Sequence, residues 1–149
     1  MPQAFPLQTL LELMQNRTDE ASRKLGQLIV AEQNEKSRLV MLEQYREEYA
    51  QRLRDAVAQG VTQILLRNYQ SFLGRIDDAI TQQSKAVLKS EQNTKTGQAD
   101  WQSQNIRLKA IDTLSNRHET KVRLNENKQE QKLLDEFSSR RYQKPDTTD

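Results

Sequence analysis

Few residues of this 149-residue chain are of the types that catalysis or metal binding requires. Adjacent carboxylates such as Glu47-Glu48 and Asp77-Asp78 could serve as a general acid and base, but neighbouring side chains point to different sides of a helix. His118 is the only histidine, so one chain cannot form a metal site that needs two imidazole ligands. We therefore expect the acidic pairs and His118 to be solvated residues on a helix surface.

Two further kinds of site, built on thiolates or on glycine-rich loops, are also missing from the sequence. The chain contains no cysteine, which excludes disulfides, thiolate nucleophiles and thiolate metal sites. Its four glycines stand singly and do not form the glycine-rich loop that cradles phosphate groups. We predict a protein that is not an enzyme and that uses no metal and no cofactor.

Charge and hydropathy argue against nucleic acid and membranes as direct partners. The 23 basic and 21 acidic residues are interspersed and give a net charge of +2, without the basic block typical of nucleic-acid binding. No apolar run reaches the roughly 18 residues of a membrane-spanning helix, and the N-terminus lacks the pattern of a secretory signal. We expect a cytoplasmic protein that does not insert into the membrane.

The elements that carry these residues are expected to be helices throughout, so the predicted fold class is all-α. Proline is absent between Leu7 and Lys144, and residues that favour helices are abundant. Alternating steps of four and three residues select mostly apolar or aromatic side chains, which is the seam of a coiled coil. In the first half of the chain the seam is Leu7, Leu11, Met14, Thr18, Ala21, Leu25, Leu28, Glu32, Glu35, Leu39, Leu42, Arg46, Tyr49, Leu53 and Ala56.

A reversal of the chain is predicted near Gly60, where glycine allows a helix to end and Thr62 can cap the next one. Folding back about Gly60 places the polar centres of the two seams opposite each other, which favours a long antiparallel two-helix coiled-coil hairpin. The alternative is a three-helix bundle with a second break within residues 90–97. The second seam is Leu66, Tyr69, Leu73, Ile76, Ile80, Gln83, Val87, Ser90, Thr94, Gly97, Trp101, Gln104, Leu108 and Ile111.

The second helix is predicted to be longer than the first and to overhang it at the C-terminus. The expected organisation is a single elongated domain, 1–149, with helix 1 at about 7–58, a turn at about 59–62, helix 2 at about 63–137 and a polar tail at 138–149. Residues past about Leu114 would have no helix to pair with, and an unpaired helix is marginal in water. This segment either frays or docks on another protein. Its apolar side chains are Val122, Leu124, Leu133, Leu134 and Phe137.

A second group of apolar side chains flanks the seam near the turn. It is expected to form one continuous patch from Leu42, Tyr45 and Tyr49 on the first helix and Phe72, Ile76 and Ala79 on the second. Two helices bury only one seam, so a flanking patch of this kind is typical of a protein interface. The alternative is that Tyr45 and Phe72 merely widen the core.

The order of these residues resembles the FliJ family. The pattern that carries the resemblance is Met41-Leu42 with Tyr45 and Tyr49, Gly60, Asn68-Tyr69-Gln70 with Phe72, Ala79-Ile80-Thr81-Gln82, and, near the C-terminus, Gln131-Lys132 with Asp135-Glu136-Phe137 and Arg140. The similarity extends over nearly the whole chain. It implies a coiled coil, similar to the central stalk of rotary ATPases, that serves flagellar type III protein export.

The resemblance also implies partners and a place in the cell. Members of the family bind the hexameric export ATPase FliI and promote its assembly, contact the export gate protein FlhA, and help to recycle export chaperones such as FlgN and FliT. The expected location is cytoplasmic, peripherally associated with the export apparatus of the inner membrane. The alternatives are the equivalent stalk protein of a virulence-type secretion system and a structural coiled-coil spacer.

Two sets of residues are assigned on this basis. The resemblance implies gate binding by Leu42, Tyr45, Tyr49, Phe72, Ile76 and Ala79. The chain departs from its relatives at Arg38 and Gln83, at the edges of that patch. We further hypothesise that the open ends of the helices enter the ATPase ring through Leu11, Met14, Val122, Leu133 and Phe137.

Overall fold

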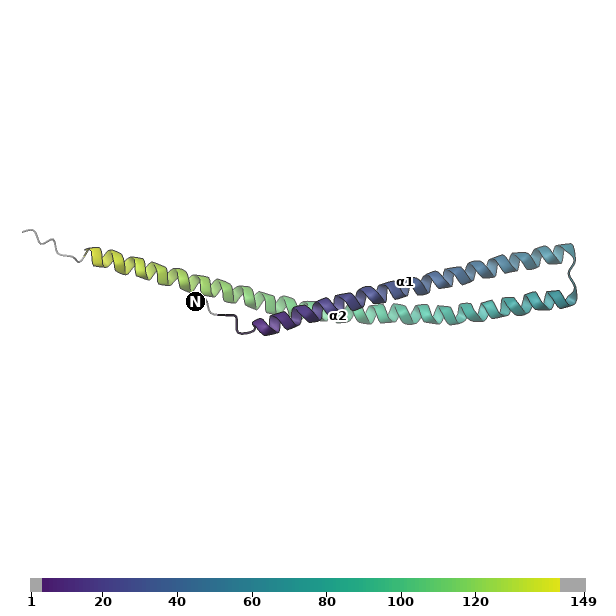
Figure 1. Cartoon of the computed structure of the whole chain (residues 1–149), viewed down its shortest axis with the longest axis horizontal. Helices are drawn as coiled ribbons and strands as arrows, with labels where there is room; N and C mark the ends of the chain where they lie inside the picture. Colours follow the sequence, from purple (N-terminus) through teal and green to yellow (C-terminus); the bar gives the residue numbers. More distant parts are fainter. Residues whose placement is uncertain (1–3, 143–149) are drawn as a thin grey trace, which may run out of the picture. The chain divides into compact units, whose positions relative to one another are not determined.

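The computed structural model describes residues 4–142, which form two long α-helices and no strand. Helix α1 comprises Gln8–Gln59 and helix α2 comprises Gln63–Tyr142. The two helices pack against each other and are joined at one end by a short connection (Figure 1). This confirms the predicted all-α hairpin. The alternative with a third helix is wrong, because α2 continues without a break through residues 90–97.

The connection between the helices has the backbone geometry expected of a glycine. Gly60 has a φ of 90°, and its N–H donates to the carbonyl oxygen of Val57 at 3.2 Å. The hydroxyl of Thr62 accepts from the backbone N–H of Leu65 at 3.3 Å, which satisfies one of the unpaired donors at the start of α2. The sequence-based prediction of the turn and of its cap is therefore confirmed.

The described chain divides into two compact units, and the prediction of a single domain stays a prediction. One unit comprises Asp19–Ser103, which contains the turn. The other comprises the described residues up to Thr18 together with those from Gln104 onward. The predicted polar tail includes residues 143–149, which lie outside the described residues.

The core of the unit Asp19–Ser103 is the predicted seam. Ala21, Ile76 and Val87 are buried, and the remaining seam positions of this unit are at least half-buried, except Arg46. Gly97 marks a close approach of the two helices, because a Cβ atom added there would lie 2.6 Å from Cδ1 of Leu28. A residue larger than glycine at this position requires the Leu28 side chain to move.

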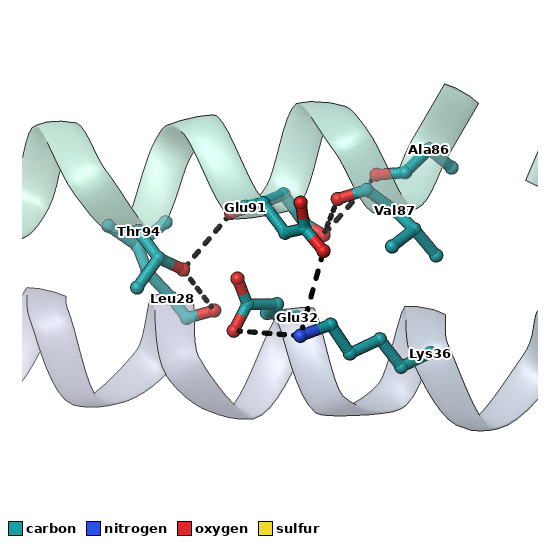
Figure 2. A network of polar contacts seen from close by, with 8 residues as sticks. Leu28, Glu32, Lys36, Ala86, Val87, Glu91 and Thr94 are labelled. Atoms are coloured by element: carbon teal, nitrogen blue, oxygen red, sulfur yellow. Dashed lines mark hydrogen bonds and ion pairs between the residues drawn. The ribbon is translucent and has the colours of Figure 1, made fainter. Parts of the chain in front are cut away.

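The middle of this seam is polar, as the sequence predicts. The Nε2 group of Gln83 donates to the backbone oxygen of Glu35 at 2.9 Å and also to its carboxylate. Farther from the turn, the hydroxyl of Thr94 lies 3.4 Å from the carbonyl oxygen of Leu28 on the other helix. Lys36 extends between two carboxylates, 3.8 Å from Glu32 and 3.6 Å from Glu91 (Figure 2).

The unit that contains both ends of the described chain has its own buried residues. In this unit the segment before α1 covers a part of α2 that the sequence predicts to be unpaired. Met14 and Thr18 are buried on α1, and Ser115 is buried on α2. Before α1, the ring of Phe5 lies 5.5 Å from that of His118, measured between centroids. The expectation that His118 is solvated is therefore wrong, since its side chain is half-buried beside an aromatic ring.

The N-terminal segment also changes where the unpaired part of α2 begins. Phe5 and Gln8 line a groove with Ser115, His118 and Val122, which places an apolar cover over a stretch expected to overhang. A backbone hydrogen bond of 3.1 Å from Gln8 to Phe5 forms the turn that brings this cover into place. The side chains are exposed throughout residues 123–141, so the uncovered stretch begins after Val122 and not after Leu114.

Glycine-to-alanine substitutions separate the role of the turn from that of the helices. Neither Gly60 nor Gly26 has a neighbouring heavy atom within 4 Å of an added Cβ, so the two sites differ mainly in backbone conformation. Gly60→Ala should lower the free energy of unfolding by about 1 kcal/mol or more, because alanine is strained at positive φ. Gly26→Ala should raise it by about 0.5–1 kcal/mol. Urea denaturation of both variants provides the comparison, and stabilisation by both would contradict the turn geometry.

Candidate functional site

Exposed apolar side chains are the main features of the surface that the structure describes. Within residues 4–142, no group of three or more His, Cys, Asp or Glu side chains is placed to hold a metal ion. Neither α1 nor the described length of α2 is apolar enough over a sufficient stretch to cross a membrane. The surfaces of interest are the two sets of apolar residues that the sequence singles out.

The first set lies in the unit that contains the turn and is called here the turn-side patch: Leu42, Tyr45, Tyr49, Phe72, Ile76 and Ala79. Its three aromatic rings form a row across the two helices. The rings of Tyr45 and Tyr49 stack at 5.9 Å between centroids with an interplanar angle of 18°. The ring of Tyr49 meets that of Phe72 at 4.5 Å and 43°. Aromatic rings 4.5–7 Å apart in offset or tilted arrangements attract each other, so this row also holds α1 to α2.

The members of the turn-side patch differ in how much of each side chain a partner could reach. Tyr45 is 50% exposed and Phe72 is 38% exposed, whereas Ile76 is only 7% exposed and belongs to the core. The other three residues are half-buried. The accessible surface of the patch therefore consists mainly of Tyr45 and Phe72, whereas Ile76 belongs to the seam.

Charged side chains lie at the edge of the turn-side patch, and one pair of them connects the two helices. Arg46, expected in the seam, is exposed and instead donates two hydrogen bonds to the carboxylate of Asp77 on α2, one of them at 3.5 Å. The hydrogen bond to Asp77 raises the pKa of the Arg46 guanidinium above its ordinary value. The guanidinium of Arg52 lies 5.0 Å from the centroid of the Tyr49 ring, a cation–π distance.

Sequence reasoning missed two exposed residues beside this patch. Leu65 is 45% exposed and precedes Phe72 by seven residues, so both lie on the same side of α2. Met41 is 58% exposed and precedes Tyr45 by four residues on α1. The heptad spacing of Leu65, Phe72 and Ala79 was the signal that could have revealed the extension toward the turn.

The second predicted set lies in the other unit, and the structure divides it into covered and exposed residues. Met14 is buried, while Leu11 and Val122 are half-buried. Leu133 and Phe137 are exposed, at 66% and 63%, and Leu134 between them is equally open. These last three residues are called here the C-terminal apolar cluster. The guanidinium of Arg141 lies 5.7 Å from the centroid of the Phe137 ring.

Comparison with known proteins identifies the family. The family model described as "Flagellar FliJ protein" matches residues 3–147. The chain belongs to the flagellar FliJ family. It is accordingly a coiled-coil protein of flagellar type III export, which confirms the resemblance seen in the sequence.

Individual members of the FliJ family align over most of this chain. The flagellar FliJ protein of Escherichia coli (strain K12) is 33% identical over 134 residues, which is 90% of this chain and 91% of that protein. The flagellar FliJ protein of Salmonella typhi is 31% identical over 140 residues, which is 94% of this chain and 95% of that protein.

One solved structure shares the fold of this FliJ-family chain. CT670 from Chlamydia trachomatis, a proposed YscO homolog, superimposes with a TM-score of 0.64 over 95% of this chain and 96% of its own. At 15% sequence identity this likeness concerns the fold alone.

The difference in burial within the turn-side patch predicts different effects on stability. Ile76→Ala should lower the free energy of unfolding by about 2–4 kcal/mol, because it removes methyl groups from the seam. Tyr45→Ala should cost less than about 1 kcal/mol, because half of that side chain is already in water. Thermal and urea denaturation, followed by circular dichroism, measure both effects. Equal losses from the two variants would contradict the assignment of Ile76 to the core and Tyr45 to the surface.

Proposed function

We propose that this chain acts as the stalk of the flagellar export ATPase, binding the FliI hexamer with one unit and the export gate protein FlhA with the other. The observation that carries the proposal is that each unit exposes its own apolar surface in a protein with a single seam. Family membership supplies the identities of the two partners. Sequence identities of 31–33% to flagellar proteins favour this role over that of a virulence-type stalk.

The turn-side patch is the proposed gate-binding surface. Its exposed aromatic side chains, Tyr45 and Phe72, are of the type that dominates binding energy at protein interfaces. The ring row and the Arg46–Asp77 ion pair fix these side chains before a partner arrives, so little rotamer freedom remains to be lost on binding. Leu65 and Met41 enlarge the surface that FlhA would cover.

The C-terminal apolar cluster is the proposed ATPase-binding surface. Residues 123–141 carry Leu133, Leu134 and Phe137 on a helix that no other described part of the chain covers. A helix without a packed face gains stability from docking into a groove of another protein. Leu11, Met14 and Val122 contribute by holding the base of this unit together and not by direct contact.

The chain itself performs no reaction under this proposal. It works by positioning FliI, promoting assembly of the hexamer and linking it to FlhA, in the cytoplasm beside the inner-membrane export apparatus. Export chaperones such as FlgN and FliT are the remaining proposed partners, and their recycling would occur on the same protein.

Gate binding is tested with substitutions of exposed residues only. Tyr45→Ala combined with Phe72→Ala should weaken binding to the cytoplasmic part of FlhA by about tenfold or more, measured by calorimetry. Leu88→Ala is the matched control, because Leu88 is a 64% exposed apolar residue of α2 outside the patch. Unchanged affinity in the double variant, with wild-type helicity, would rule the patch out as the gate contact.

ATPase binding is tested at the other unit by Leu133→Ser combined with Phe137→Ser. These side chains are exposed, so the variant should fold normally while its capture of FliI and its promotion of hexamers decline by about tenfold. Leu124→Ser serves as control, because Leu124 is 56% exposed on the opposite side of the same helix. If the control loses as much FliI binding as the double variant, the C-terminal apolar cluster is not the contact.

A further inference from the structure

The exposed end of α2 has an order of charges that makes one of its faces complementary to itself. Alternating steps of four and three residues along this face give Glu126, Glu130, Leu133, Phe137 and Arg140. The face is thus acidic at its N-terminal part, apolar in the middle and basic at its C-terminal part. All five side chains are exposed. We call these residues the C-terminal stripe.

We propose that the C-terminal stripe binds a second copy of this chain, with the two copies of α2 running antiparallel. In an antiparallel pair the stripe of the second copy runs in the reverse order, from basic through apolar to acidic. The acidic part of each copy therefore lies beside the basic part of the other. Contacts of this kind obey a twofold axis, in which the same patch is used on both chains. A partner surface with a single sign of charge would match only one of the two charged parts of the stripe, whereas a second copy matches both.

The register of this pair follows from coiled-coil packing. The seam of a coiled coil alternates between two positions of the heptad, called a and d, and Leu133 and Phe137 occupy one of each. In an antiparallel pair an a position of one helix packs beside a d position of the other. Placing Leu133 of one copy against Phe137 of the second brings Glu130 opposite Arg140 at both ends of the apolar centre. Leu134, 66% exposed beside the seam, then closes the contact near the twofold axis.

The same register limits the strength of the dimer. Glu136, on the flank of the seam, would lie close to Glu136 of the second copy, and like charges at such positions repel. The contact is also short, with three apolar side chains from each chain. We therefore expect weak association that depends on concentration, as for a small and partly polar interface.

This inference does not rest on the proposed ATPase contact, although both use Leu133 and Phe137. A dimer through the C-terminal stripe covers the C-terminal apolar cluster and keeps it from water while no other partner is bound. Where FliI uses the same cluster, FliI and the second copy compete for it.

Exchange of the two charges provides the test in the full chain. Sedimentation velocity should show concentration-dependent dimers of the wild type, and Glu130→Arg or Arg140→Glu alone should weaken the dimer by about tenfold. An equimolar mixture of the two variants should restore it. In the mixed pair, the side chain at position 130 of each chain again faces a side chain of opposite charge at position 140 of the other. The chain carrying both substitutions should also dimerise as the wild type does.

Control variants outside the C-terminal stripe change the net charge by the same amounts. Asp135→Arg and Lys132→Glu lie on other sides of α2 and should leave dimerisation unchanged, alone or mixed. The proposal is overturned if the wild type remains monomeric up to about 500 µM, or if the mixture associates no better than the single variants. If the wild type stays monomeric and Leu133→Ser with Phe137→Ser abolishes FliI binding, these residues serve the ATPase alone.

Discussion

The structure depends on one narrow seam between two helices, and such a seam cannot enclose a side chain on all sides. In the described chain no large side chain is fully buried, and the residues counted as core, such as Met14 and Ile76, keep 6–7% of their surface in water. Each seam contact therefore contributes less than a contact in a globular core. Stability must accumulate over many turns of helix, which explains why the two helices comprise 52 and 80 residues.

The same constraint leaves apolar side chains exposed. Two described helices that share one seam give little cover to most apolar side chains outside it, so Phe72, Leu65 and Phe137 remain exposed. In a larger domain a second layer of structure would bury such residues. In the two described helices they stay in contact with water, which is why they are the residues proposed to contact other proteins.

Polar contacts at the centre of the seam give the pairing its register. Apolar layers alone would tolerate a shift of one helix along the other by a heptad, because leucine meets leucine in several alignments. The bond from Gln83 to Glu35 and the approach of Thr94 to the Leu28 carbonyl oxygen are specific to one alignment. A shift would leave the Gln83 amide without this partner in a partly buried place, at a cost of about 1–3 kcal/mol. The Thr94 hydroxyl would keep its bond of 3.0 Å to the carbonyl oxygen of Ser90 on its own helix. The alignment of the helices in turn assembles the aromatic row of the turn-side patch.

Heptad spacing accounts for what the sequence could predict and for what it could not. It identified the seam, the turn at Gly60 and the continuity of α2, because these follow from a repeat and from one permissive residue. It placed Ile76 in the seam and Tyr45 beside it, but it did not indicate that Arg46, at a seam position, is exposed and paired with Asp77. It also gave no signal for the contact of Phe5 with His118, since that contact comes from a segment before α1 that carries no repeat.

The central claim is that the two helices pair in a single antiparallel register fixed by the polar centre. The chain has no native cysteine, so pairs of introduced cysteines report this register without interference. We predict that the variant with Leu28→Cys and Thr94→Cys oxidises rapidly to an intramolecular disulfide. The variant with Leu28→Cys and Val87→Cys, displaced by about 10 Å along α2, should oxidise far more slowly. Equal rates in the two variants, or disulfides formed only between chains, would contradict the account.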